Sequence, residues 1–211
     1  MLQREQKTTA LIDNLERETD RIMSEFDGFL DGTRVLLLLQ RTKEGGHNKE
    51  HKRRRARFIT HGDPEQFKRS LFELLLLQAV MTTEYRIYLC AAPRDVRKAE
   101  MEFKRLMLEV DFQEGENKKF FYEHIEDKWI SALMSASPAK GRGLFILDID
   151  DKEGEDMLGY ALKECEELNI EIVKSYRTKN GWHLVVRPFN RTLWPVSIGE
   201  VKDDGLLLLS Y

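Results

Sequence analysis

The chain is organised around residues 143–188, which read GLFILDIDDKEGEDMLGYALKECEELNIEIVKSYRTKNGWHLVVRP. The apolar run at 144–147 predicts a buried strand, and it leads directly into Asp148 and Asp150. Side chains at positions i and i+2 of a strand point to the same face of a sheet. The sequence therefore predicts two carboxylates on one face of a strand.

The remainder of this stretch predicts a helix and two further strands. Apolar residues recur at helical spacing over 158–168, and a strand is expected at 170–175. A basic turn at 179–181 then leads into a strand at 182–187, which begins with Trp182 and His183. The histidine is thus expected on a strand of the same sheet as the carboxylates.

The flanking segments predict an α+β fold. Residues 3–30 carry apolar side chains at three- and four-residue steps, which indicates one amphipathic helix ending at Gly32. We expect this helix, within 1–32, to pack on a single α+β domain of residues 33–211; a helix for dimerisation or for a partner protein is the alternative. Because strands and helices do not alternate regularly, we expect a mixed, partly antiparallel central sheet with flanking helices.

Composition limits the classes of function. The 211 residues include 34 basic and 37 acidic side chains, for a net charge of −3, which excludes a uniformly basic nucleic-acid binder but allows a local basic patch. Cys90 and Cys165 lack metal-ligand spacing and are expected to be buried. With no signal peptide and no apolar run long enough to span a bilayer, the sequence predicts a cytoplasmic protein without a membrane partner.

A local basic patch is present at 41–57, which holds eight basic residues and two acidic ones. Apolar strands at 33–40 and 57–60 flank it, so we expect a hairpin with a basic tip. A solvated loop is one interpretation of this tip. The other is contact with nucleic-acid phosphates through the arginines Arg53, Arg54, Arg55 and Arg57.

The carboxylate pair indicates a metal site. Asp148 and Asp150 repel each other unless a cation lies between them, and oxygen ligands suit Mg²⁺ or Mn²⁺. Such a pair serves phosphoryl and nucleotidyl transfer; alternatively, the two residues only end a strand and cap the next helix. A two-metal site needs a third acid, and the candidates are Glu200, Asp203 and Asp204. The sequence does not decide among them. In our predicted ligand set, Asp203 stands as the third acid beside Asp148 and Asp150.

Two other motif interpretations are weaker. Residues 202–205 match the KxDG of nucleic-acid ligases, but only six residues follow, too few for the remaining ligase motifs. A phosphatase of the haloacid-dehalogenase type also begins with a strand ending in DxD. Here too few residues remain after the DxD strand to complete its sheet.

The motif residues carry a family resemblance. LFILDID, the helix and strand after it, and RTKNGWHLVV resemble the archaeo-eukaryotic primase superfamily, whose signature is an hhhDhD strand, a histidine strand after a TSG-like turn, and a later acidic residue. RIYLCAAPRD at 86–95 resembles the upstream strand of that superfamily, with Cys90 and Ala92 at its polar positions. The resemblance covers about residues 84–190, and one glycine, rather than two or three, precedes the histidine. Small phage and bacterial proteins with a TxNGxH element look similar.

The resemblance implies an RRM-like catalytic core and template-directed nucleotidyl transfer, with a place in DNA replication. Asp148, Asp150 and His183 would be catalytic, and Mg²⁺ or Mn²⁺ would be the cofactor. The incoming nucleoside triphosphate would be held by Arg177, Thr178, Lys179, Gly181 and His183. A catalytically inactive, primase-like protein that binds nucleic acid or a protein partner is the alternative. The catalytic interpretation requires the DxD pair, one late acid and His183 to converge in the folded chain.

Overall fold

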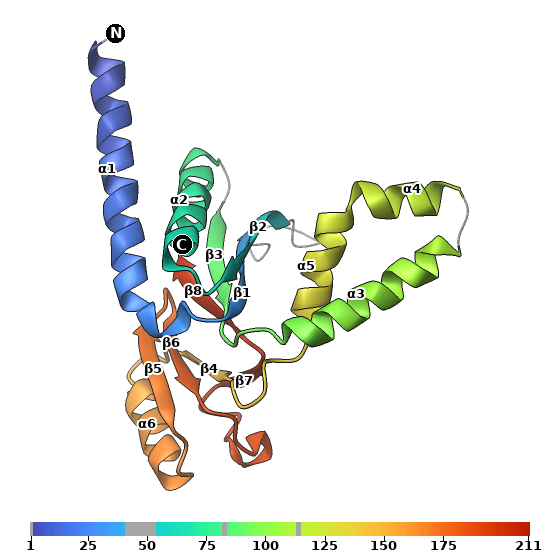
Figure 1. Ribbon diagram of the computed structural model, residues 1–211. Helices are drawn as coiled ribbons and strands as arrows, with labels where there is room; N and C mark the ends of the chain where they lie inside the picture. Colours follow the sequence, from blue (N-terminus) through green and yellow to red (C-terminus); the bar gives the residue numbers. More distant parts are fainter. Residues whose placement is uncertain (1, 41–53, 82–83, 113–114) are drawn as a thin grey trace, which may run out of the picture. The chain divides into compact units, whose positions relative to one another are not determined.

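A computed structural model describes residues 2–40, 54–81, 84–112 and 115–211 (Figure 1). The chain divides into two compact units. The first comprises Met1–Leu89, Arg94–Ser137 and Leu208–Tyr211, and the second comprises Cys90–Pro93 and Pro138–Leu207. Helices accompany two four-stranded antiparallel sheets, so the expected α+β class is confirmed. The single domain expected over 33–211 spans parts of both units.

The first sheet has the strand order β2-β1-β3-β8. Its strands are β1 (Thr33–Gln40), β2 (Arg54–His61), β3 (Tyr85–Cys90) and β8 (Leu206–Ser210). β1 is antiparallel to both β2 and β3, and the expected β1–β2 hairpin is confirmed. The apolar run Val35, Leu36, Leu37 and Leu38 is buried almost completely, as a central strand requires.

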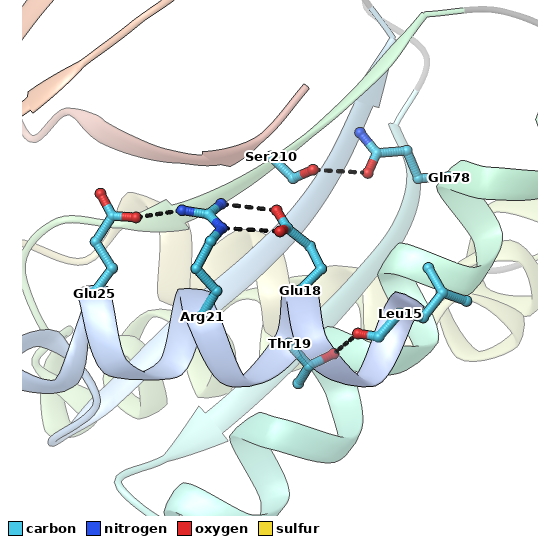
Figure 2. Close-up of polar contacts among 7 residues, drawn as sticks. All are labelled: Leu15, Glu18, Thr19, Arg21, Glu25, Gln78 and Ser210. Atoms are coloured by element: carbon cyan, nitrogen blue, oxygen red, sulfur yellow. Dashed lines mark hydrogen bonds and ion pairs between the residues drawn. The ribbon is translucent and has the colours of Figure 1, made fainter. Parts of the chain in front are cut away.

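Two helices of the first unit lie against each other. α1 (Leu2–Glu25), which a short 3₁₀ turn η1 (Asp27–Phe29) follows, packs on α2 (Pro64–Val80). The stripe that α1 buries consists of Leu15, Thr19 and Ile22, and Phe26, directly after the helix, is also buried. Thr19 Oγ1 donates to the carbonyl of Leu15 at 2.7 Å (Figure 2). The expectation that the N-terminal helix packs on its domain is therefore confirmed for the half of α1 that carries this stripe.

Polar side chains make further contacts along α1, between α2 and β8, and at the start of α2. Figure 2 shows Arg21 bridging Glu18 and Glu25 along the exposed side of α1. It also shows Ser210 Oγ of β8 donating to Gln78 Oε1 of α2 at 3.1 Å. α2 has a capped N-terminus, because the Asp63 carboxylate accepts from the Glu65 amide and proline occupies the first helical position.

Three helices form an arm beside the first sheet (Figure 1): α3 (Val96–Asp111), α4 (Glu116–Glu123) and α5 (Ile125–Ser135). The apolar spacing over 118–134 is typical of a single helix, but the chain breaks at His124, whose φ is −117°. In an unbroken helix, residues eight apart would point about 80° away from each other. The break lets Phe121 and Trp129 both pack on Phe103, at ring distances of 6.3 and 5.5 Å.

The second sheet, in the second unit, has the strand order β5-β6-β4-β7. Its elements in chain order are β4 (Phe145–Asp150), α6 (Met157–Glu167), β5 (Ile172–Arg177), β6 (Gly181–Val186), η2 (Arg191–Leu193) and β7 (Glu200–Asp203). β6 is antiparallel to both β4 and β5, so those two are parallel with β6 between them. This is a split β-α-β arrangement, in keeping with the expected RRM-like core.

Helix α6 covers one face of the second sheet. Leu147 and Ile149 of β4 share a buried cluster with Met157, Ala161 and Cys165 of α6. Both cysteines are buried as expected and form no disulfide, and burial raises the pKa of the Cys165 thiol to about 11. Because side chains alternate along a strand, Ile146, Asp148 and Asp150 lie on the other face of the sheet, hereafter the site face.

The last two strands belong to different sheets. Although a short turn separates them in the chain, β7 pairs with β4 and β8 joins β3. The chain changes direction at Asp204, whose φ of 59° is in the left-handed region. Among the helices of the described ranges, none has the length and apolar character needed to cross a membrane.

Candidate nucleotide and metal site

Four strands each contribute one residue to a row across the site face. In register order these are Tyr176 of β5, His183 of β6, Asp148 of β4 and Glu200 of β7. Directly opposed residues of antiparallel strands have their side chains on the same face, with Cβ atoms about 5 Å apart. The predicted carboxylate and histidine therefore meet, because register places them opposite each other.

Hydrogen bonds hold the imidazole of His183 from both sides. His183 Nε2 lies 3.1 Å from Asp148 Oδ1, and His183 Nδ1 lies 2.8 Å from the Tyr176 hydroxyl. An ionised carboxylate only accepts, so Nε2–H is the donor to Asp148. In the neutral ring, Nδ1 then accepts the proton of the Tyr176 hydroxyl. The ring is thereby fixed with its N–H directed at the carboxylate.

Lys202 occupies the other oxygen of the same carboxylate. Its ammonium forms an ion pair with Asp148 Oδ2 and lies 3.8 Å from Glu200 Oε2. In register Lys202 is opposite Ile146, so it shares the site face and reaches Asp148 diagonally. Sequence reasoning missed this residue; its position two residues after a candidate acid is the signal that places it on the same face.

The electrostatic surroundings favour an ionised Asp148. The hydrogen bond from His183 holds the pKa of the Asp148 carboxyl well below its usual range, and the hydrogen bond from Lys202 lowers this pKa further. Partial burial opposes both effects, since it disfavours the charged form. The two hydrogen bonds to Asp148 therefore stabilise its ionised form.

This lowered pKa predicts a dependence of stability on pH. A depressed pKa in the folded state stabilises the fold fully above the unfolded value, about 3.9 for aspartate, and the contribution is lost as pH falls below it. Asp148→Asn should therefore reduce the slope of stability against pH in acid. Denaturant unfolding of both proteins between about pH 5 and pH 2 measures this slope, and equal slopes would contradict the assignment.

Asp150 lies on the site face at the end of β4, opposite Gly181. A Cβ added at Gly181 would stand 1.9 Å from the Ile149 carbonyl oxygen and 2.9 Å from the Asp150 Cα. Only glycine permits this close approach between the two strands. The sequence predicts Gly181 in nucleotide binding, and the structure gives it a definite packing role.

The turn between β5 and β6 is hydrogen-bonded to the chain at the end of β4 that carries Asp150. The Asp151 amide donates to the carbonyl of Asn180, and the Thr178 amide donates to the carbonyl of Gly181, each at 2.8 Å. Thr178 and Lys179, predicted to hold a nucleotide, therefore lie in a turn at the end of the strand that carries Asp150.

Arg177 is not brought to the row of site residues. It is opposite Trp182 in register, on the face that α6 covers, and its guanidinium lies 5.3 Å from the Trp182 ring. It also makes a bidentate ion pair with Asp151, at 3.0 and 2.5 Å. The expected role of Arg177 in nucleotide binding gains no support from this placement.

The late carboxylate beside Asp148 is Glu200, not Asp203. Asp203 is opposite Phe145 and so lies on the α6 face of the sheet, where it pairs with Arg191 at 2.8 Å. Asp204 lies in the turn that follows β7. The prediction of Asp203 as third ligand therefore lacks the required placement, and Glu200 is the late acid on the site face, because a shift of one residue along a strand reverses the face.

Most of the predicted basic tip lies outside the described residues. This applies to Arg53 and to the side chains of Arg54 and Arg55, although the last two belong to β2. Arg57 forms an ion pair with Asp127 of α5. Contact of this segment with nucleic acid stays a prediction.

The side chains on the site face offer oxygen atoms, which are the type of ligand that a hard divalent cation prefers. Asp148, Asp150 and Glu200 supply carboxylate oxygens, and with Lys202 they leave two negative charges for a cation to neutralise. In the described part of the chain, no three Asp, Glu, His or Cys side chains are grouped closely enough to hold a metal as they stand. Metal binding here would require Lys202 to leave Asp148 and the carboxylates to draw together.

Comparisons of the chain with protein-family models, with curated proteins and with solved structures found no significant match. The resemblance to the primase superfamily therefore depends on the motif residues themselves.

Proposed function

We propose that this protein is a metal-dependent nucleotidyltransferase of the primase–polymerase type, which adds nucleotides to a nucleic-acid template or primer. The observation that carries the proposal is the 3.1 Å contact between His183 Nε2 and Asp148 Oδ1, two residues 35 positions apart in the chain. The resemblance requires the DxD strand and the histidine strand to be neighbours with these side chains on one face. If the motifs matched by coincidence, there would be no reason for the two strands to be neighbours or for the two side chains to share a face.

The residues of the site face have distinct roles in this proposal. Asp148, Asp150 and Glu200 would hold Mg²⁺ or Mn²⁺, which when bound would neutralise charge on the phosphates during transfer. Tyr176 keeps the ring of His183 oriented, so that the Nε2–H can donate to a phosphate oxygen near Asp148. Lys179 adds a positive charge at the end of β4. The proposed partners are nucleoside triphosphates and a DNA or RNA strand, and the proposed location is the cytoplasm.

The test is incorporation of labelled nucleotides by the purified protein on a primed and an unprimed template, with Mn²⁺, with Mg²⁺ and with a chelator. The proposal expects incorporation with at least one of the two metals and none with the chelator. Incorporation that continues with the chelator, or that never occurs with any template, would refute it.

One observation favours a second candidate, a nucleic-acid-binding protein without catalysis. The ammonium of Lys202 already neutralises Asp148, the carboxylate on which metal chemistry would depend. In that case Asp148→Ala would leave affinity for nucleic acid intact, and the wild-type protein would incorporate no nucleotide. Filter or fluorescence binding of a single-stranded oligonucleotide, alongside the incorporation assay, separates the two candidates.

A further inference from the structure

The position of Lys202 suggests more than a static ion pair. Its ammonium contacts Asp148 Oδ2 and stands 3.8 Å from Glu200 Oε2, so it lies between two of the three carboxylates that the proposed site offers a metal. His183 engages the remaining oxygen of Asp148 at 3.1 Å. Both oxygens of the central carboxylate are therefore occupied by donors from neighbouring strands.

An ammonium and a divalent cation compete for this carboxylate at close range. Two cations a few ångströms apart repel strongly, and the repulsion is greater in a half-buried site than in water. His183 contacts Asp148 through a hydrogen bond, which its Nε2–H can redirect to a phosphate oxygen. Lys202 is the group whose charge competes with the cation for Asp148.

The surroundings of Lys202 allow this movement. Its side chain is 40% exposed, and that of Glu200 is 73% exposed, whereas Asp148 is only 27% exposed. A lysine carries its charge on a flexible four-carbon stem. The ammonium can thus swing away from Asp148 without disturbing the buried cluster on the other face of the sheet.

We propose that Lys202 is an exchangeable counterion, which occupies Asp148 in the metal-free protein and transfers to a phosphate of the nucleotide when a divalent cation binds. This inference rests on the proposed function. A bound nucleotide brings negative phosphate oxygens to the site as the cation takes over Asp148, so the ammonium exchanges one anion for another. Lys202 would then resist binding of the metal alone and support binding of the metal with a nucleoside triphosphate.

Lys202→Met tests this, because methionine keeps most of the apolar stem and removes the charge. Mn²⁺ binding is measured by electron paramagnetic resonance, first with Mn²⁺ alone and then with a non-hydrolysable nucleoside triphosphate at saturating Mn²⁺. The variant should bind Mn²⁺ alone about tenfold more tightly than the wild type, and the triphosphate about tenfold more weakly. Lys152→Met is the matched control, since Lys152 donates to the carbonyl of Ser197 and its replacement should leave both affinities unchanged.

The outcomes separate this inference from the proposed function. If the wild type binds Mn²⁺ and triphosphate but Lys202→Met binds Mn²⁺ no more tightly, the counterion role is refuted and the proposed function stands. If neither protein binds Mn²⁺ or triphosphate, both are refuted. Thermal melting confirms that the variant folds, and Lys202→Gln, with the same expected shifts, replaces it if it does not.

Discussion

Asp148→Ala is expected to abolish metal-dependent nucleotide incorporation, with a loss of roughly a thousandfold or more, the scale of removing a group that stabilises developing charge. Asp148 contacts both His183 and Lys202, and it forms the centre of the row across the site face. Its removal takes away the central metal ligand and the acceptor that orients the imidazole. The rate of labelled nucleotide incorporation with Mn²⁺ is the measurement.

The matched control for this variant is Asp151→Ala. Asp151 is an acid of the same segment, but its carboxylate pairs with Arg177 rather than with the site residues. Its replacement should leave the rate of incorporation close to that of the wild type. A thermal melt of each variant shows whether the fold is retained. Incorporation by folded Asp148→Ala at the wild-type rate would contradict the assigned role.

Gly181→Ala is expected to destabilise the protein by about 3 kcal/mol or more, or to prevent folding. The added Cβ would stand 1.9 Å from the carbonyl oxygen of Ile149 and 2.9 Å from the Cα of Asp150. Both of these are backbone atoms of β4, so relief requires the two central strands of the second sheet to move apart. The free energy of unfolding from chemical denaturation measures the cost.

Gly28→Ala is the control for this comparison, because a Cβ at Gly28 meets nothing within 4 Å. It removes the same backbone freedom from the unfolded chain and should change the free energy of unfolding by less than about 1 kcal/mol. A Gly181→Ala protein as stable as Gly28→Ala would show that β4 and β6 do not approach each other as described.

The sequence predicts the local part of the site well. The apolar run before Asp148 indicates a buried strand, and the period of two places Asp148 and Asp150 together. Leu162 illustrates the limit of such patterns: it matches the helical spacing of the expected stripe, yet it is 40% exposed, while Met157 and Ala161 are buried against the sheet. The rotation of a helix about its axis depends on what it packs against, which its own sequence does not specify.

The non-local part of the site could not be predicted from the sequence, because it depends on strand register. The choice between Glu200 and Asp203 is a matter of which residue stands opposite Asp148, and an odd shift in register reverses the face. Register likewise places Lys202 on the site face and Arg177 on the α6 face. Strand partners are equally non-local: β8 follows β7 in the chain, yet it joins the other sheet beside β3.

The most direct test of the central claim is equilibrium binding of a nucleoside triphosphate in the presence and absence of Mn²⁺, for the wild type and for His183→Ala. His183 is the residue that links the DxD strand to the proposed phosphate contact. The account predicts binding by the wild type that requires the metal and falls about tenfold or more in the variant, as expected for loss of a hydrogen bond to a charged group. Failure of the wild type to bind any nucleotide in the presence of metal would contradict it.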